Sequence, residues 1–175
     1  MLFRSLGLVG FGGIAVEVAR LARAFGMRVI AWTRHAAADR VGAKWVEFVE
    51  LSTLMSTSDI VSVHVALTPQ TQNLLTAELL GQLKDDAIFV NTARGEIIDE
   101  SALVELLRAQ RIRGAALDVF VDEPLSPDHV LRQFDNVVLT PHTAYNTPEA
   151  SARILDIALD NVLAYFSGDP MNVVN

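Results

Sequence analysis

The sequence predicts an α/β protein with a doubly wound parallel sheet, and three observations predict it. Short apolar runs alternate with helical patterns over the whole length of 175 residues. Several of the runs are continuously apolar, as expected for parallel strands covered on both faces. The first run leads directly into a glycine-rich turn followed by a helical pattern, Gly10-Phe11-Gly12-Gly13-Ile14-Ala15.

Seven segments carry the strand signal. They are Leu6–Gly10, Arg28–Trp32, Lys44–Phe48, Ile60–His64, Ala87–Asn91, Arg113–Val119 and Val137–Thr140. Helix signals fall between most of these segments, which predicts parallel pairing through crossover helices.

Several predicted helices have recognisable ends. The helix after the glycine turn places apolar residues at helical spacing from Val16 to Phe25. Three later helices follow a residue suited to N-capping, namely Thr76, Asp99 and Thr147. The last of them has Pro148 at its first position and ends at Gly168. The stretch 122–128, with two prolines, is the most loop-like part of the chain.

The glycine turn has the form of a phosphate-binding loop. Gly10 permits a tight turn, Gly12 lets a pyrophosphate approach the backbone, and the small Ala15 lets helix and strand pack closely. Backbone N–H groups and the positive end of the helix dipole then face the anion. We therefore predict that a dinucleotide contacts Gly10, Gly12, Gly13 and Ile14. The alternative is that these glycines only close a strand–helix unit.

Composition argues against several other classes of protein. Hydrophobic residues make up 51% of the chain, which argues against disorder, and a net charge of −7 argues against nucleic acid as a partner. Cysteine is absent, so neither disulfides nor a thiol metal site is expected, and we predict no bound metal. No apolar run approaches the ~20 residues that cross a bilayer, and residues 1–5 do not form a signal peptide. We expect a cytoplasmic protein without a membrane partner.

Four residues with suitable chemistry follow or end predicted strands in the second half: Arg94, Asp118, Glu123 and His142. Ligands of open α/β sheets bind at the carboxyl ends of the strands, so we expect these side chains to converge on the dinucleotide crevice. Each also has a plainer interpretation: a surface arginine, a turn-capping aspartate, a solvated glutamate and a loop histidine. His35 and His129 receive only such an interpretation.

Three blocks in this order carry a resemblance to a known family: Asn91-Thr92-Ala93-Arg94-Gly95, Leu117-Asp118-Val119-Phe120 and Thr140-Pro141-His142. With the glycine turn, they make the chain resemble the NAD(P)-binding domain of the D-isomer-specific 2-hydroxyacid dehydrogenases, which include phosphoglycerate dehydrogenase and glyoxylate/hydroxypyruvate reductase. The resemblance extends from about Leu6 to Val174 and implies one Rossmann-type domain over residues 1–175. The family's substrate domain has no counterpart here, so we expect a partial protein.

The resemblance implies an oxidoreductase that transfers a hydride between a nicotinamide cofactor and a small D-2-hydroxy acid or 2-oxo acid. His142 would be the base in oxidation and the acid in reduction. Glu123 would hydrogen-bond the other ring nitrogen and favour the protonated imidazole. Arg94 would hold the substrate carboxylate and polarise the 2-oxo group with its forked donors.

The resemblance also implies contacts with the cofactor. The residues expected around the nicotinamide are Thr92, Ala93, Arg94, Asp118 and His142. Those expected beside the adenosine are His64 and Val65. At a strand end, His64 could equally be a core histidine.

The choice between NAD and NADP depends on the end of the second strand. A carboxylate there normally binds the ribose 2′-OH of NAD, whereas an arginine accommodates the 2′-phosphate of NADP. Thr33 stands where the acid is expected and Arg34 follows it. This pattern predicts NADP or tolerance of both cofactors, unless Arg34 simply points to solvent.

A second class of function stays open on the sequence alone. The family contains nucleotide-sensing and corepressor-type members that keep much of the site, so the chain could be a non-catalytic NAD(H)-binding module. The resemblance further implies a homodimer, because related proteins pair through this same domain.

Overall fold

The computed structural model describes residues 5–34 and 45–173. The chain divides into two compact units, Met1–Pro141 and His142–Asn175. Among the described residues, the first unit holds all the strands and four α-helices, and the second holds one long helix.

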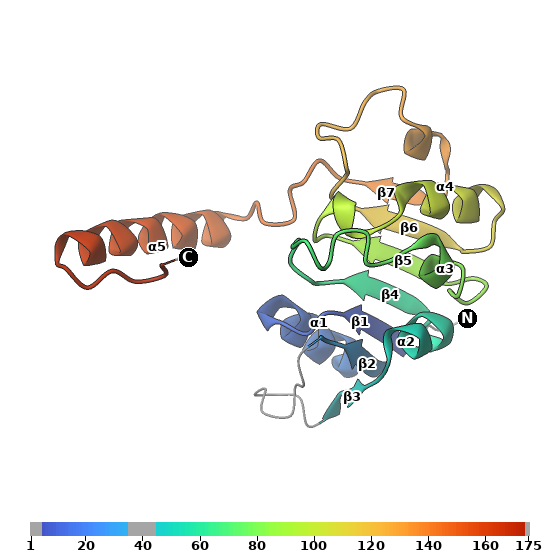
Figure 1. The fold of residues 1–175 in the computed structure, drawn as a ribbon, viewed down its shortest axis with the longest axis horizontal. Coiled ribbons are helices and arrows are strands. Elements are labelled where there is room, and N and C mark those ends of the chain that lie inside the picture. The colour runs from blue at the N-terminus through green and yellow to red at the C-terminus, as the bar shows by residue number, and fades with distance from the viewer. Residues whose placement is uncertain (1–4, 35–44, 174–175) are drawn as a thin grey trace. The chain divides into compact units, whose positions relative to one another are not determined.

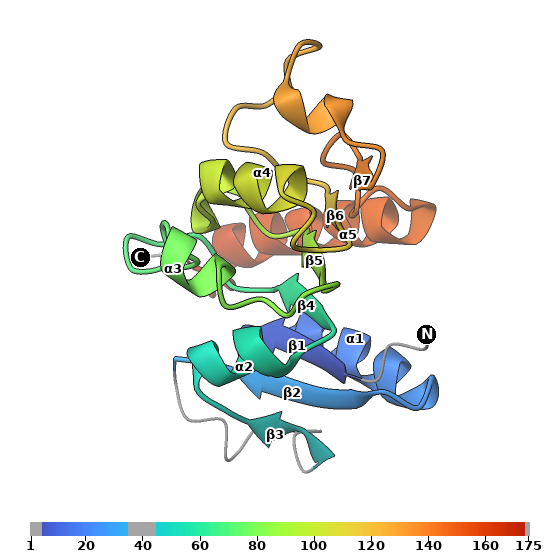
Figure 2. The ribbon, with the colours of Figure 1, turned by 90° about the vertical axis from the view of Figure 1, so that its right-hand side faces the viewer.

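The first unit is built on a seven-stranded sheet in the order β3-β2-β1-β4-β5-β6-β7, which Figure 1 shows as a continuous stack. The strands are β1 (Ser5–Val9), β2 (Arg28–Trp32), β3 (Glu47–Phe48), β4 (Ile60–Val63), β5 (Ile88–Asn91), β6 (Gly114–Leu117) and β7 (Val137–Leu139). Every pair is parallel. Figure 2 shows the same stack turned by 90°. The predicted α/β parallel fold is confirmed.

Three of the five α-helices in the described part of the chain begin with a side-chain N-cap. The helices are α1 (Gly13–Ala24), α2 (Leu51–Thr57), α3 (Ala77–Leu80), α4 (Glu100–Arg108) and α5 (Pro148–Phe166), with short 3₁₀ turns η2 (Gly95–Ile97) and η3 (Val130–Gln133). The side chains of Thr76, Asp99 and Thr147 each accept a hydrogen bond from a backbone N–H in the first turn of their helix. The three predicted N-caps are therefore confirmed.

Apolar side chains cover both faces of the sheet around β1 and β2. Leu6 and Leu8 of β1 belong to the cluster that α1 closes, whereas Val9 faces the opposite cluster. The buried residues of α1 are Ala15, Ala19 and Ala22. Their small side chains let the helix lie close to the strands, as the glycine-turn motif requires. The opposite cluster is closed by α2, α3 and α4.

The third strand is shorter than predicted. The sequence predicts Lys44–Phe48; Lys44 lies outside the described residues, and of the other four residues β3 contains only Glu47 and Phe48. The Trp45 ring instead lies beneath the Arg23 guanidinium, with Arg23 Cζ 4.9 Å from the centroid of the ring. Val46 is buried in the cluster that α1 closes. β3 pairs with β2 alone and ends the sheet, so side-chain packing determines where its ladder begins.

The second unit consists mainly of α5. Its 19 residues include none that is buried. Large apolar side chains are exposed along it, including Leu155, Leu159, Val162 and Phe166. None of the described helices is both long and apolar enough to span a membrane.

Candidate functional site

A cavity lies at the carboxyl ends of β4 and β5 in the first unit. Its volume is about 430 Å³, and its lining residues are Ile14, Val63, His64, Val65, Ala66, Leu67, Thr92, Ala93 and Arg94. The strand order reverses beside this cavity, because β2 and β3 lie on one side of β1 and β4 to β7 lie on the other. Such a switch point is where open α/β sheets bind ligands.

The lining includes six residues that the sequence predicts for a cofactor. They are Ile14, His64, Val65, Thr92, Ala93 and Arg94. The sequence analysis did not single out Val63, Ala66 or Leu67, although Ala66 and Leu67 lie two and three residues beyond the end of a predicted strand. That position was the available signal, because loops after parallel strands line the ligand edge.

The glycine turn fits a phosphate group. Gly10 has φ +96, and a Cβ there would lie 2.7 Å from Val65 Cγ1 and 2.8 Å from the carbonyl carbon of His64. Only glycine combines this backbone conformation with so close an approach. A Cβ on Gly12 or Gly13 would meet nothing within 4 Å, so the backbone at the start of α1 is open to a ligand. Gly12 is the N-cap and its helix has no acidic residue in the first turn, which suits an anion.

His64 forms part of the cavity wall and is also tied to the sheet. Its Nε2 lies 2.9 Å from Ser62 Oγ, and its backbone N–H donates to the Val9 carbonyl at 2.7 Å. Burial lowers the pKa of His64 below its usual 6.5, because desolvation disfavours the charged imidazole. The ring is therefore neutral at pH 7 and presents an uncharged surface to a ligand.

Arg34 lies just beyond β2 at the same edge. Its side chain is exposed, and its Nη2 donates to the carbonyl of Gln70 at 2.8 Å. The guanidinium therefore reaches the loop that follows β4 rather than extending into solvent alone. Thr33 separates Arg34 from the end of the strand, and no carboxylate occupies either position.

Arg94 and Asp118 follow β5 and β6. Arg94 is exposed, and its Nη1 donates to the carbonyl of Ala93 at 2.6 Å. Asp118 is 4% exposed; its N–H donates to the carbonyl of Asn91 at 3.0 Å, and its Oδ1 accepts from Thr140 Oγ1 at 2.5 Å. The first of these bonds ties the Asp118 backbone to the strand that precedes the Arg94 turn.

Glu123 lies in the loop after β6. Its Oε1 accepts the backbone N–H of Phe120 at 3.0 Å. The carboxylate is thus held against its own loop, at the carboxyl side of the same strand that presents Asp118.

His142 opens the second unit. Its φ is 52, and its ring meets Tyr145 edge-on with centroids 6.4 Å apart. Its approach to Arg94 and Glu123 stays a prediction.

The other histidines differ in what the structure shows. His129 caps η3 through Nδ1, and its Nε2 lies 3.2 Å from Glu100 Oε1, which gives it a structural role. His35 lies outside the described residues. Within the described part of the chain, no group of three His, Asp or Glu side chains is arranged to hold a metal ion.

The chain is similar in sequence to a family of known proteins. The family model "D-isomer specific 2-hydroxyacid dehydrogenase, NAD binding domain" matches residues 3–144. A glyoxylate reductase of Korarchaeum cryptofilum is 42% identical over 173 residues, which cover 98% of this chain and 52% of that protein. An (S)-sulfolactate dehydrogenase of Chromohalobacter salexigens is 45% identical over 159 residues, covering 90% and 52%. The chain spans about half the length of the curated relatives it matches.

Solved structures show the same likeness. An acyclic imino acid reductase in complex with NADPH and D-Arg superposes with a TM-score of 0.89 at 37% identity, covering 98% of this chain and 54% of that one. D-lactate dehydrogenase with NAD⁺ from Lactobacillus jensenii gives 0.87 at 29%, covering 98% and 55%. The chain therefore belongs to the D-isomer-specific 2-hydroxyacid dehydrogenase family, of which it carries the NAD-binding domain.

Proposed function

We propose that this protein works as an oxidoreductase that transfers a hydride between NAD(P) and the CH–OH or C=O group of a small D-2-hydroxy or 2-oxo acid. The observation that carries the proposal is the cavity at the β1/β4 switch point with Arg94 on its rim. A guanidinium beside a nicotinamide pocket supplies the forked donors that a carboxylate substrate needs. Membership of the dehydrogenase family supports the same activity.

The residues would share the work as follows. Gly10, Gly12, Gly13 and Ile14 would hold the pyrophosphate, and the bound nicotinamide supplies or accepts the hydride. Thr92, Ala93 and Asp118 would orient its ring, and His64 and Val65 would lie beside the adenosine. Arg94 would hold the substrate carboxylate. His142, two residues beyond Thr140 in the sequence, would give or take the proton, and Glu123 would pair with it.

Four narrower proposals accompany this one. The whole chain works as one NAD(P)-binding domain, and NADP binds at least as well as NAD because Thr33 replaces the acid that would bind the ribose 2′-OH of NAD and Arg34 follows it. The protein forms a homodimer, which the exposed apolar face of α5 supports. It works in the cytoplasm, which the absence of cysteine favours.

Turnover of defined acids tests the main proposal. Glyoxylate, hydroxypyruvate and pyruvate would be supplied with NADH and NADPH to this chain, and to this chain fused to the substrate half of a related reductase. We expect the fusion to reduce the acid faster than this chain alone does. The chain alone would offer the substrate only one wall, which leaves the substrate poorly positioned and the nicotinamide exposed to water. His142→Ala in the fusion should lower kcat by about 10²–10⁴-fold, the usual range for a general acid–base group.

Two results would contradict the proposal. One is a fusion that binds NAD(P)H, seen by its fluorescence, yet reduces no 2-oxo acid. The other is turnover that survives His142→Ala. The first result favours a non-catalytic nucleotide-sensing module, for which the same cofactor cavity suffices, and the second removes His142 as the acid–base group. Gly12→Val is the control for binding itself, because its branched side chain would enter the open space where the pyrophosphate approaches.

A further inference from the structure

The turn that carries Arg94 is held by a buried side chain for which the motif analysis proposed no role. Asn91 ends β5 and is 0% exposed. Its Oδ1 accepts the backbone N–H of Ala93 at 3.0 Å, and its Nδ2 donates to the carbonyl of Arg94 at 2.9 Å. Both ends of one carboxamide are therefore used on the turn 92–94.

The backbone of Asn91 links this turn to the next strand. Its carbonyl accepts the N–H of Asp118 at 3.0 Å. Asn91 thus fixes both the path of the chain toward Arg94 and the position of the Asp118 backbone. Arg94 is the side chain proposed to contact the substrate, and Asp118 is the one proposed to contact the nicotinamide.

The far end of the turn is also confined. A Cβ on Gly95 would lie 2.1 Å from the carbonyl carbon of Phe120 and 2.4 Å from its oxygen. Phe120 in turn donates its N–H to Glu123 Oε1. The turn therefore lies directly against the loop that carries Glu123, and it cannot shift toward that loop.

We propose that Asn91 is a positioning residue that sets where the Arg94 guanidinium stands. The inference rests on the proposed function, because Arg94 matters through the substrate carboxylate it would hold. The position requires a side chain that donates at one end and accepts at the other. Aspartate has the same size but cannot donate to the Arg94 carbonyl, and serine can reach only the Ala93 N–H. Loss of the bond removes this partner from the partly buried Arg94 carbonyl and lets the turn leave its place.

The rate of trypsin cleavage after Arg94 measures how firmly the turn is held, and it does not require the protein to be enzymatically active. Arg94 is exposed, and the carbonyl of its peptide bond to Gly95 is the group that Asn91 holds. We expect Asn91→Asp and Asn91→Ser to raise cleavage after Arg94 by about tenfold or more, with cleavage elsewhere unchanged. Cleavage sites would be identified by mass spectrometry, and a urea transition would confirm that each variant folds.

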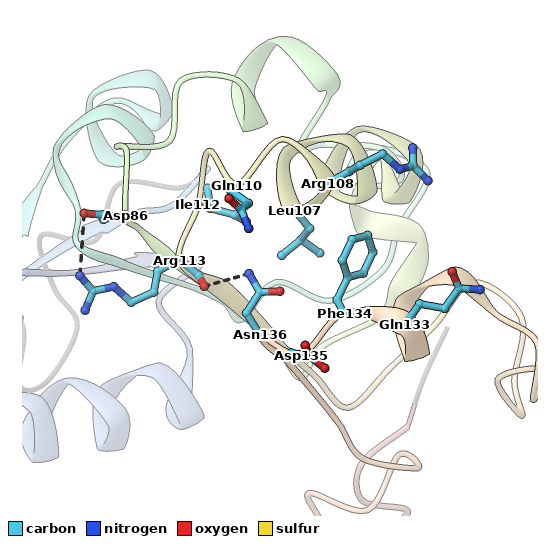
Figure 3. Close-up of a pocket in the computed structure, with 10 residues that line it drawn as sticks. All are labelled: Asp86, Leu107, Arg108, Gln110, Ile112, Arg113, Gln133, Phe134, Asp135 and Asn136. Atoms are coloured by element: carbon cyan, nitrogen blue, oxygen red, sulfur yellow. Dashed lines mark hydrogen bonds and ion pairs between the residues drawn. The ribbon is translucent and has the colours of Figure 1, made fainter.

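Asn136, an exposed asparagine, provides a control for the loss of an amide–carbonyl bond. Its Nδ2 donates to the carbonyl of Arg113 at 3.0 Å, beside a hollow at the opposite ends of β6 and β7 (Figure 3). Asn136→Ser removes the same kind of bond far along the sheet from the turn and should leave cleavage after Arg94 unchanged. Equal cleavage after Arg94 in wild type and in a folded Asn91 variant would overturn the proposal.

A double-mutant cycle separates positioning from a general structural effect. In the active fusion, Asn91→Ser should lower kcat/KM for the 2-oxo acid by about 10–100-fold, mainly through KM, because a small misplacement of a positioning group is costly. In the Arg94→Lys background the same change should cost less than about threefold. Fully additive losses would overturn the proposal. If wild type reduces no acid, the proposed function fails and trypsin cleavage alone decides the role of Asn91.

Discussion

We expect the guanidinium of Arg34, just beyond β2, to distinguish NADP from NAD. The 2′-phosphate of NADP carries about two negative charges, whereas the 2′-OH of NAD carries none, so Arg34 should favour NADP selectively. Arg34→Ala should raise the Kd of NADPH by about tenfold or more and leave that of NADH within about twofold. Cofactor fluorescence titrations measure both.

Arg111 is the control for this change. It is also an exposed arginine, paired with Asp85 just before β5 rather than at the cofactor edge. Arg111→Ala should leave both affinities unchanged. A wild-type protein that prefers NADH by tenfold or more, about 1.4 kcal/mol, would contradict the reading of Thr33-Arg34.

His64 should make stability depend on pH. Its pKa is near 6.5 in the unfolded chain and lower in the fold, so the unfolded state binds more protons between the two values. Stability from the neutral ring is complete above 6.5 and is lost as pH falls toward the folded pKa. The free energy of unfolding should therefore fall with decreasing pH, by at most about 1.4 kcal/mol per pH unit for this group.

The variant His64→Gln tests this dependence. Glutamine keeps a polar group near Ser62 but does not titrate, so urea unfolding from pH 7 to pH 4.5 should show a shallower fall than in wild type. Every other ionisable group is common to the two proteins, which isolates His64. Identical pH slopes would mean that burial does not oppose protonation of this ring.

The backbone of the glycine turn was predictable because that motif carries its own geometry. The glycine turn predicts the positive φ of Gly10 because only that conformation joins a strand to a helix so tightly. Asn91 was not predictable, since an asparagine at a strand end gives no sign of which carbonyl its amide will reach. Its role depends on the path of the turn, and that path depends on how closely Gly95 approaches Phe120.

Helices and strands were predictable to different degrees. Helix starts at Thr76, Asp99 and Thr147 were located because capping is a local interaction between a side chain and its own first turn. The start of β3 was not, because Trp45 has a strand-like side chain but packs under Arg23 from α1. Contacts between distant segments decide such edges.

At the scale of the whole molecule, the second unit does not bury the apolar side chains of its own helix α5. Leu155, Leu159, Val162 and Phe166 repeat at spacings of four, three and four, the seam of a helix that pairs with another helix. Each is at least 52% exposed. A second copy can present the same seam in a symmetric dimer, with the apolar residues of each helix covering the other.

We therefore expect the chain to be a dimer by light scattering at micromolar concentration. Leu159→Glu places a charge in the middle of the seam, so it should shift the mass to that of a monomer. Leu21→Glu is the control, because Leu21 is also exposed, at 58%, but lies on α1 in the other unit. It should leave the dimer intact. The reverse pattern, with Leu21→Glu alone giving a monomer, would place the interface on α1, and a monomeric wild type would remove the dimer altogether.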